Sequence, residues 1–461
     1  MRRGAGRGVT AAIAAAISLV GGLGIAVAVR PASPDAVDRS GPGQAVSPAP
    51  SPATTSTTAP EAVPPVAESQ SQLVPDTALK LALDAVWSRT PRGCLTVADR
   101  GQVLYAANPE AAVAPASVIK MLTASAALDL LDENEVLKTQ VRSAAVGPGG
   151  VIAGDVWLVG GGDPLLGTAD WATATERGDV TSLETLADRV VAAGVSAIDG
   201  RVVGDESRYD ALRYVDSWPP RLIQDGEIGP MSALEVNGGF RTLGHPGEPF
   251  ADPPSAAAGV LTELLLQRGV RVQGGAAAGQ APPEARELAA VESAPVGRLV
   301  QTMLRESDNM VAELLVKEIG LRSAGVGSTS AGVQAVAQSL QRQGLPVGGT
   351  TVADGSGLSD DDRVTCRLLA SLLSQAEESL IGGLPLAARD GTLERRFVGT
   401  PVAGRMRAKT GSLDGIASLA GTVQTAAGNR LTFAYVVNGL PVGDSGRKLQ
   451  DALAAALVGS P

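Results

Sequence analysis

Histidine is almost absent from this chain of 461 residues, which contains only His245. A zinc hydrolase of the H-E-x-x-H type needs two histidines and is therefore excluded. A Ser-His-Asp enzyme would have to use His245, whose Leu-Gly-His-Pro-Gly surroundings are typical of a loop. If the protein is a hydrolase, its general base is expected to be another type of residue.

Cysteine, aromatic residues and lysine are scarce as well. Two cysteines, Cys94 and Cys366, are too few for a four-thiolate metal site, and 3 % aromatic residues are too few for a surface that stacks nucleic-acid bases. The net charge is −10 and no basic tract follows the N-terminus, so nucleic acid is not an expected partner. Only six of the 38 basic residues are lysine, which makes the position of each lysine informative.

The N-terminal segment 1–29 is predicted to direct export. Three arginines precede the uncharged apolar run Val9–Val29, whose 21 residues are enough to span a bilayer as a helix. A basic flank of this kind stays in the cytoplasm, which places the rest of the chain outside it, in the cell envelope. The small residues Ala26–Ala28 favour a cleaved signal peptide, whereas the length of the run favours a retained anchor, so the protein is expected to be secreted or anchored.

Composition divides the remainder of the chain. Residues 30–73 are rich in Pro, Ser, Thr and Ala and have too few large apolar residues to fold, which predicts a disordered linker. From residue 74 onward helices are predicted at 79–87, 117–131, 258–268, 296–305, 310–319, 364–373 and 448–458. Strands are predicted at 94–98, 102–106, 156–159, 200–203, 405–408, 419–424 and 431–438. The early hairpin and the three late strands can share one antiparallel sheet only if the glycine-rich middle of the chain is an insertion.

The first motif with chemical meaning is Ser117-Val118-Ile119-Lys120, in the first turn of an apolar helix. A serine needs a base to become a nucleophile, and a lysine one turn away supplies that base when burial lowers its pKa. The alternative is a surface lysine whose stem lies along a helix end. The S-x-x-K pattern recurs at Ser445–Lys448, so it is weak evidence by itself.

Two further motifs follow in the sequence. Ser307-Asp308-Asn309 lies between two predicted helices, where a hydroxyl and a carboxamide can relay a proton and hold a substrate carbonyl; helix capping is the alternative. Lys409-Thr410-Gly411-Ser412 ends a predicted strand, where the lysine offers a cation to a carboxylate and the glycine lets a substrate approach. A charged strand end before a turn is the alternative for this third motif.

In this order, the three motifs resemble those of penicillin-recognising serine acyltransferases. Ser445–Lys448 does not fit, because it follows the other two motifs, and Gly443–Gly446 resembles a chymotrypsin-type nucleophile loop without a suitable histidine. The 190 residues from Ser117 to Ser307 are more than simple β-lactamases have. The chain is thus similar to peptidase family S13, the D-alanyl-D-alanine carboxypeptidases/endopeptidases or low-molecular-mass class C penicillin-binding proteins, which carry inserted domains at this point. The similarity runs from Leu79 to Val458 and includes Val159–Pro164, Asp199–Asp205, Asp354–Ser359 and Asp390–Leu393.

This resemblance implies an α+β fold. A β-lactamase/transpeptidase-like catalytic domain, with an antiparallel sheet flanked by helices, would consist of residues 74–145 and 291–461, and 146–290 would form one or more strand-rich inserted domains. The implied function is that of a serine-type D-Ala-D-Ala carboxypeptidase/endopeptidase, which acts on peptidoglycan stem peptides and is acylated by penicillins and other β-lactam antibiotics. No metal or other cofactor is implied, and the membrane is contacted only through the N-terminal segment.

The resemblance also implies roles for single residues. Ser117 attacks the carbonyl between the last two D-alanines and Lys120 is its base, while Ser307 passes the proton to the leaving D-alanine and Asn309 orients the substrate amide. Lys409, Thr410, Gly411 and Ser412 bind the substrate, the first two through its terminal carboxylate. The backbone N–H groups of Ser117 and Ser412 form the oxyanion hole.

Two other functions stay open. A β-lactamase would share the fold but should carry an efficient deacylating group, and the Tyr-x-Asn motif of one such class is absent. A wall-binding scaffold with vestigial catalytic residues is the second. A preference for carboxypeptidase or endopeptidase action depends on the shape of the pocket.

The two cysteines pose a separate question. Export places Cys94 and Cys366 in an oxidising compartment, so they either form a disulfide across the inserted region or lie apart as two buried, apolar side chains. Their Cα atoms would have to lie within about 7 Å of each other to be joined.

Overall fold

The computed structural model describes residues 77–244, 246–441 and 444–460. The targeting segment expected at 1–29, the linker expected at 30–73 and His245 therefore lie outside the described residues. No helix within the described ranges is long and apolar enough to cross a membrane.

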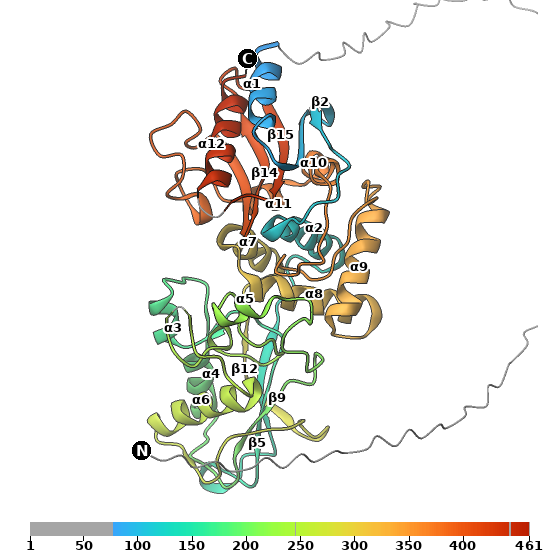
Figure 1. Cartoon of the computed structure of the whole chain (residues 1–461). Coiled ribbons are helices and arrows are strands. Elements are labelled where there is room, and N and C mark those ends of the chain that lie inside the picture. The colour runs from blue at the N-terminus through green and yellow to red at the C-terminus, as the bar shows by residue number, and fades with distance from the viewer. Residues whose placement is uncertain (1–76, 245, 442–443, 461) are drawn as a thin grey trace, which may run out of the picture. The chain divides into compact units, whose positions relative to one another are not determined.

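One five-stranded antiparallel sheet joins the two ends of the folded chain (Figure 1). Its strands, in spatial order, are β13 (Met406–Leu413), β14 (Ile416–Gln424), β15 (Arg430–Asn438), β1 (Arg92–Asp99) and β2 (Gln102–Ala107). The pairing of β1 with β15 runs from Arg92 opposite Asn438 to Asp99 opposite Leu431. The expectation that the early hairpin and the late strands share a sheet is confirmed.

Helices cover both faces of this sheet (Figure 1). On one face lie α1 (Thr77–Trp87) and α12 (Ser445–Val458). On the other lie α2 (Lys120–Leu130), α7 (Val296–Glu306), α8 (Asn309–Ala324), α9 (Thr329–Arg342), α10 (Cys366–Gln375) and α11 (Glu378–Gly383). Successive strand residues alternate between the two cores, as the period of two requires: Ala434 and Val436 face α10, whereas Phe433 and Tyr435 face α12. The α+β fold with an antiparallel sheet between helices is confirmed.

The middle of the chain forms three smaller sheets around a core of its own. A mixed sheet has the order β11 (Ala277–Ala278), β9 (Val202–Asp205), β5 (Val156–Val159), β3 (Lys138–Ser143) and β12 (Arg286–Glu292). The others contain β10 (Arg271–Val272), β8 (Ala197–Ile198) and β4 (Val151–Ile152), and the pair β6 (Leu166–Gly167) and β7 (Thr181–Ser182). The helices of this region are α3 (Ala169–Ala174), α4 (Leu183–Ala192), α5 (Pro220–Gln224) and α6 (Pro253–Gln267), with short 3₁₀ turns η2 (Pro148–Gly150) and η3 (Asn237–Gly239).

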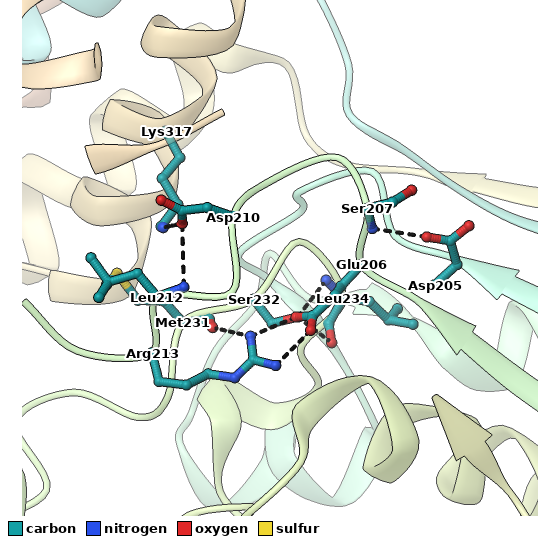
Figure 2. Close-up of polar contacts among 10 residues, drawn as sticks. All are labelled: Asp205, Glu206, Ser207, Asp210, Leu212, Arg213, Met231, Ser232, Leu234 and Lys317. Carbon is teal, nitrogen blue, oxygen red and sulfur yellow. Dashed lines mark hydrogen bonds and ion pairs between the residues drawn. The ribbon is translucent and has the colours of Figure 1, made fainter. Parts of the chain in front are cut away.

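A loop that follows β9 ties the middle region to helix α8 (Figure 2). The ammonium group of Lys317 is fully buried and pairs with the carboxylate of Asp210. Next to this pair, Glu206 accepts two hydrogen bonds of 2.6 Å from Arg213 and one of 2.6 Å from Ser232 Oγ. Because an unpaired charge at a buried position costs several kcal/mol, Lys317 binds the loop firmly to α8.

Two local expectations need refinement. Ser117 lies in the first helical turn of its segment, as expected, but this is a 3₁₀ turn, η1 (Ala116–Ile119), and α2 begins only at Lys120. Residues three apart are eclipsed in a 3₁₀ turn, which aligns Ser117 and Lys120 on one side. The third motif lies at the end of its strand, as expected, but the strand is longer than the predicted 405–408, because β13 continues to Leu413 through pairing with β14.

A disulfide joins Cys94 on β1 to Cys366 at the start of α10, with a Cα–Cα distance of 5.6 Å. The two cysteines are 272 residues apart in the sequence. Of the two fates that the sequence leaves open for them, the structure has the bridge. It therefore connects the sheet to the helix that covers it.

Candidate active site

The segment that carries Ser117 is fastened to the sheet by two side chains. Asn438, the last residue of β15, donates from Nδ2 to the carbonyl of Ala114 (3.0 Å) and accepts from its N–H (2.9 Å). Ser418 Oγ on β14 donates to the carbonyl of Pro115 (2.6 Å). Ala116 then has a positive φ of 49°, a turn that directs the chain into η1. Ser117 is thus held at a defined position beside β13.

Gly411 allows β13 to approach this segment closely. A Cβ atom at position 411 would lie 2.1 Å from Ser418 Oγ and 3.0 Å from the backbone nitrogen of Ser117. The first distance is far below van der Waals contact, so a side chain would displace the hydroxyl that fixes Pro115. The glycine of the third motif is therefore needed for packing between strand and nucleophile, independently of any substrate.

Lys120 is completely buried, and its ammonium nitrogen contacts three oxygen atoms. These are Asn309 Oδ1 at 2.7 Å, the carbonyl of Ser356 at 2.5 Å and Ser117 Oγ at 3.0 Å. The amide and carbonyl oxygens only accept, whereas the hydroxyl can also donate. The ammonium form can donate to all three oxygens, and the neutral amine keeps two protons for the two acceptors and has a lone pair that can take the proton of Ser117.

The environment moves the pKa of Lys120 towards that neutral form. Burial lowers the pKa to about 8, because a charged ammonium loses its hydration. The carboxylates of Asp354, Glu313, Asp308 and Glu227 act in the opposite direction and keep the pKa from falling further. About one-tenth of the side chain is then neutral at pH 7, which is enough for a general base.

The second motif lies at the junction of α7 and α8. Ser307 ends α7 in the left-handed conformation, with φ of 63°. Asp308 caps α8 by accepting the N–H of Val311 at 2.9 Å, and its other oxygen pairs with Arg177. The capping alternative is therefore correct for Asp308. At this junction Ser307 lies next to Lys409, and Asn309 lies next to Lys120.

The third motif approaches the second through Lys409. Its ammonium group is completely buried and donates to Ser307 Oγ at 2.7 Å and to the carbonyl of Thr410 at 2.9 Å. Burial lowers the pKa of Lys409 well below its usual value, and the charge of Lys120 lowers it further. Thr410 Oγ1 donates to Thr392 in the turn η4 (Gly391–Leu393), which belongs to one of the stretches with family resemblance.

The structure thus brings together residues from the three motifs. Ser117, Lys120 and Asn309 form one hydrogen-bonded set, and Ser307 and Lys409 form a second. Ser412 is exposed on β13, opposite Ala417 of β14. The competing Ser445–Lys448 pattern lies in helix α12, where Ser445 Oγ contacts only the carbonyl of Pro441 at 3.4 Å among the described residues.

Sequence reasoning did not identify several groups of this site. The carbonyl of Ser356 is a partner of Lys120, and Glu227 accepts a hydrogen bond of 2.8 Å from Asn309 Nδ2 through its backbone oxygen. Ser356 belongs to the Asp354–Ser359 stretch, whose similarity to the family was the only signal available. Glu227 lies in the middle region and has no such signal.

A cavity of about 490 Å³ opens beside the second motif. Ser307 and Asn309 line it from the side of the sheet, and Trp171, Arg177 and Glu227 line it from the middle region. The space next to the catalytic groups is therefore bounded partly by residues of the long insertion.

The fold is that of a penicillin-binding protein. The structure of penicillin-binding protein 4 (dacB) from Haemophilus influenzae matches with a TM-score of 0.70 and 22 % identity, over 81 % of this chain and 98 % of that chain. Among curated relatives, carboxypeptidase DacB of Mycolicibacterium smegmatis is 34 % identical, with 79 % of each chain covered. D-alanyl-D-alanine carboxypeptidase of an Actinomadura species is 30 % identical and covers 77 % of this chain and 79 % of its own.

A family model assigns the chain more directly. The model of the D-Ala-D-Ala carboxypeptidase 3 (S13) family matches residues 81–245 and 247–458, nearly all of the folded part. The chain belongs to this family. The S13 resemblance read from the three motifs is thereby confirmed.

Proposed function

We propose that this protein is a serine D-Ala-D-Ala carboxypeptidase of the cell envelope that forms an acyl-enzyme on Ser117. The observation that carries the proposal is the set of partners around Lys120: a buried amine with two pure acceptors and one nucleophilic hydroxyl. Membership of the S13 family and the carboxypeptidase names of its relatives support the reaction type.

A residue of the site can then be assigned to each step of acylation. Lys120 takes the proton of Ser117, whose Oγ attacks the carbonyl between the two terminal D-alanines. The N–H groups of Ser117 and Ser412 stabilise the oxyanion, each by about 3–4 kcal/mol in enzymes of comparable chemistry. Ser307, hydrogen-bonded to Lys409, passes the proton taken up by Lys120 to the leaving D-alanine. Water finally hydrolyses the ester.

Recognition of the substrate falls to the other polar groups. The Lys409 ammonium and Thr410 hydroxyl bind the terminal carboxylate, and the same pair binds the carboxylate of a β-lactam. Asn309 Nδ2 orients the substrate amide, for which it must exchange its hydrogen bond to the carbonyl of Glu227. Gly411 leaves room for the substrate backbone along β13.

The test is covalent labelling of the whole protein with a fluorescent penicillin, followed by digestion and mass spectrometry. We expect one adduct, on the peptide that contains Ser117, and none in Ser117→Ala. We also expect release of D-alanine from a peptide that ends in D-Ala-D-Ala. An adduct on Ser445 would refute the assignment of the nucleophile. No adduct at all would favour a scaffold with vestigial catalytic residues.

The same labelled protein separates this activity from that of a β-lactamase. A carboxypeptidase of this mechanism should remain acylated by penicillin; the Ser307–Asn309 motif occurs in both classes of enzyme, so the lifetime of the label has to decide. Rapid loss of the label with turnover of penicillin would favour the β-lactamase instead.

The organisation of the chain is part of the proposal. Residues 1–29 would export the protein or anchor it, and 30–73 would separate the enzyme from the membrane. The catalytic domain would consist of 74–145 and 291–461, with 146–290 inserted. The pairing of β3 with β12 supports junctions slightly further out, near residues 137 and 293, because these two strands belong to the sheet of the middle region.

A further inference from the structure

The proposed reaction depends on where the amine of Lys120 points, and a loop outside the three motifs contributes to this. The carbonyl of Ser356 accepts a hydrogen bond of 2.5 Å from Lys120 Nζ. Ser356 lies in the loop 354–359, within the connection between α9 and α10. What fixes this loop therefore also fixes one of the three partners of the general base.

Glu313 on α8 holds the Gly355–Ser356 peptide from one side. Its Oε1 atom accepts the backbone N–H of Gly355 at 3.0 Å and that of Ser356 at 2.8 Å. Glu313 is completely buried, and it lies one helical turn after Asn309, another partner of Lys120. Helix α8 thus positions two acceptors of Lys120: it carries Asn309 itself, and its Glu313 holds the peptide that contains the Ser356 carbonyl.

Other contacts also hold the loop: Thr123 Oγ1 on α2 donates to the Gly355 carbonyl at 2.8 Å, but the hydrogen bonds that join the loop to α8 among the described residues are those of Glu313. Asp354 accepts the N–H groups of Ser356, Gly357 and Ser359 at 2.7–3.0 Å, which shapes the turn but does not attach it to α8. Asp354 is itself held by Trp218 Nε1 at 2.7 Å. Gly355 is packed so closely on α8 that a Cβ atom there would lie 2.5 Å from Val316.

Burial of a carboxyl group costs desolvation free energy, which two accepted hydrogen bonds do not obviously require. The second oxygen of Glu313, Oε2, has no hydrogen-bond partner among the described residues. Burial and the neighbouring Asp354 raise the pKa of Glu313 to about 8, and Lys120 is the cation that opposes this. Asp362 lies in the same cluster, and burial raises its pKa as well. A leucine would fill such a core position at lower cost, so a function must account for the acid.

We propose that Glu313 is a positioning residue for acylation: its carboxyl oxygen fixes the Gly355–Ser356 peptide, whose carbonyl then holds the Lys120 amine against Ser117. The carboxyl group acts through this accepting oxygen rather than through its charge. The inference rests on the function proposed above.

The test compares variants of the whole protein by the second-order rate of acylation with penicillin, measured from pH 6 to 9. Glu313→Gln keeps the accepting oxygen, and we expect its rate to stay within about threefold of the unaltered protein. Glu313→Leu leaves the Gly355 N–H unpaired, leaves the Ser356 N–H with Asp354 alone and loosens the Ser356 carbonyl, for which we expect a loss of about ten- to hundredfold. Leu315→Ala is the matched control, because it weakens the core on the same helix without touching the loop.

Two results would overturn the inference. One is a folded Glu313→Leu protein that acylates at the original rate; if this variant does not fold, Glu313→Asp, whose oxygen is one methylene too short, takes its place. The other is a Glu313→Gln protein whose pH profile moves by a full unit, since Glu313 would then act through its charge. Failure of the unaltered protein to be labelled at Ser117 would instead refute the proposed function itself.

Discussion

At the scale of single residues, the site contains two buried lysines in different surroundings. Lys120 contacts two oxygens that only accept and the hydroxyl of Ser117, whereas Lys409 contacts Ser307 and a carbonyl of its own strand. Burial lowers the pKa of both, since an ammonium group loses its hydration in the interior. The difference in partners predicts a difference in role: a base for Ser117, and a cation near the leaving group.

The pH dependence of acylation should report the titration of Lys120. A lysine accepts a proton only when neutral, so the rate is low below its pKa of about 8 and high above it. We expect the rate of penicillin acylation to rise about tenfold per pH unit up to roughly pH 7.5 and to level off above pH 8.5. Stopped-flow labelling at constant ionic strength measures this profile. An apparent pKa near the ordinary lysine value of about 10.4 in this profile would mean that burial does not lower the pKa of Lys120.

Removal of each lysine should produce a different kinetic defect. Lys120→Ala removes the base, and we expect acylation to fall by about 10²- to 10⁴-fold. Lys409→Ala removes a charge-assisted contact with the substrate carboxylate, and we expect KM for a D-Ala-D-Ala peptide to rise about ten- to hundredfold. Steady-state kinetics separate the two. Equal effects of both variants on acylation and on KM would contradict this division.

At the scale of secondary-structure elements, the chemistry depends on the contact between a strand and a 3₁₀ turn. The motif residues themselves could be predicted from the sequence, because each triplet combines groups of known chemistry. The 3₁₀ conformation of Ser117 and the position of Lys409 inside β13 could not, since both depend on pairing and packing with distant segments. The carbonyl of Ser356 was equally beyond prediction: every residue has a carbonyl, and only the fold decides which one faces Lys120.

A methyl group at position 411 should disturb this contact. The Cβ atom of Gly411→Ala would collide with Ser418 Oγ, so we expect a loss of about 1–3 kcal/mol in the free energy of unfolding and a marked fall in acylation. Gly275→Ala is the control, because a Cβ atom there meets nothing within 4 Å. Denaturant titration and penicillin labelling of both variants measure the effects. Unchanged acylation in a folded Gly411→Ala protein would show that β13 can shift to accommodate the methyl group without displacing Ser117.

At the scale of the whole molecule, the catalytic sheet is completed by strands from the two ends of the folded chain. The individual strands were predictable from their hydrophobic pattern, which also allowed the early hairpin and the late strands to share a sheet, but the pairing of β1 with β15 has no local signal and was not predicted. The entry and exit of the middle region were less predictable. β3 and β12 form a pair with each other, and nothing in their sequences assigns them to one sheet or the other.

The Cys94–Cys366 bridge should stabilise this arrangement. It closes a loop of 272 residues, for which chain entropy predicts a contribution of about 5–6 kcal/mol to the free energy of unfolding. We expect the double variant Cys94→Ala and Cys366→Ala to lose stability of this order in guanidinium titrations. We also expect no reactive thiol in the denatured, unreduced protein. Two thiols per chain would show that the bridge is not formed in solution.

The bridge has one more consequence, for a protein exposed to the proteases of its surroundings. Every peptide bond of the middle region lies between Cys94 and Cys366, so a single cut anywhere within it leaves the two fragments covalently joined. The sheet would keep β1 and β15 side by side, and Ser117 would keep its partners from the other fragment. Such a nicked enzyme would run as one band before reduction and as two bands after it, while it could still bind penicillin.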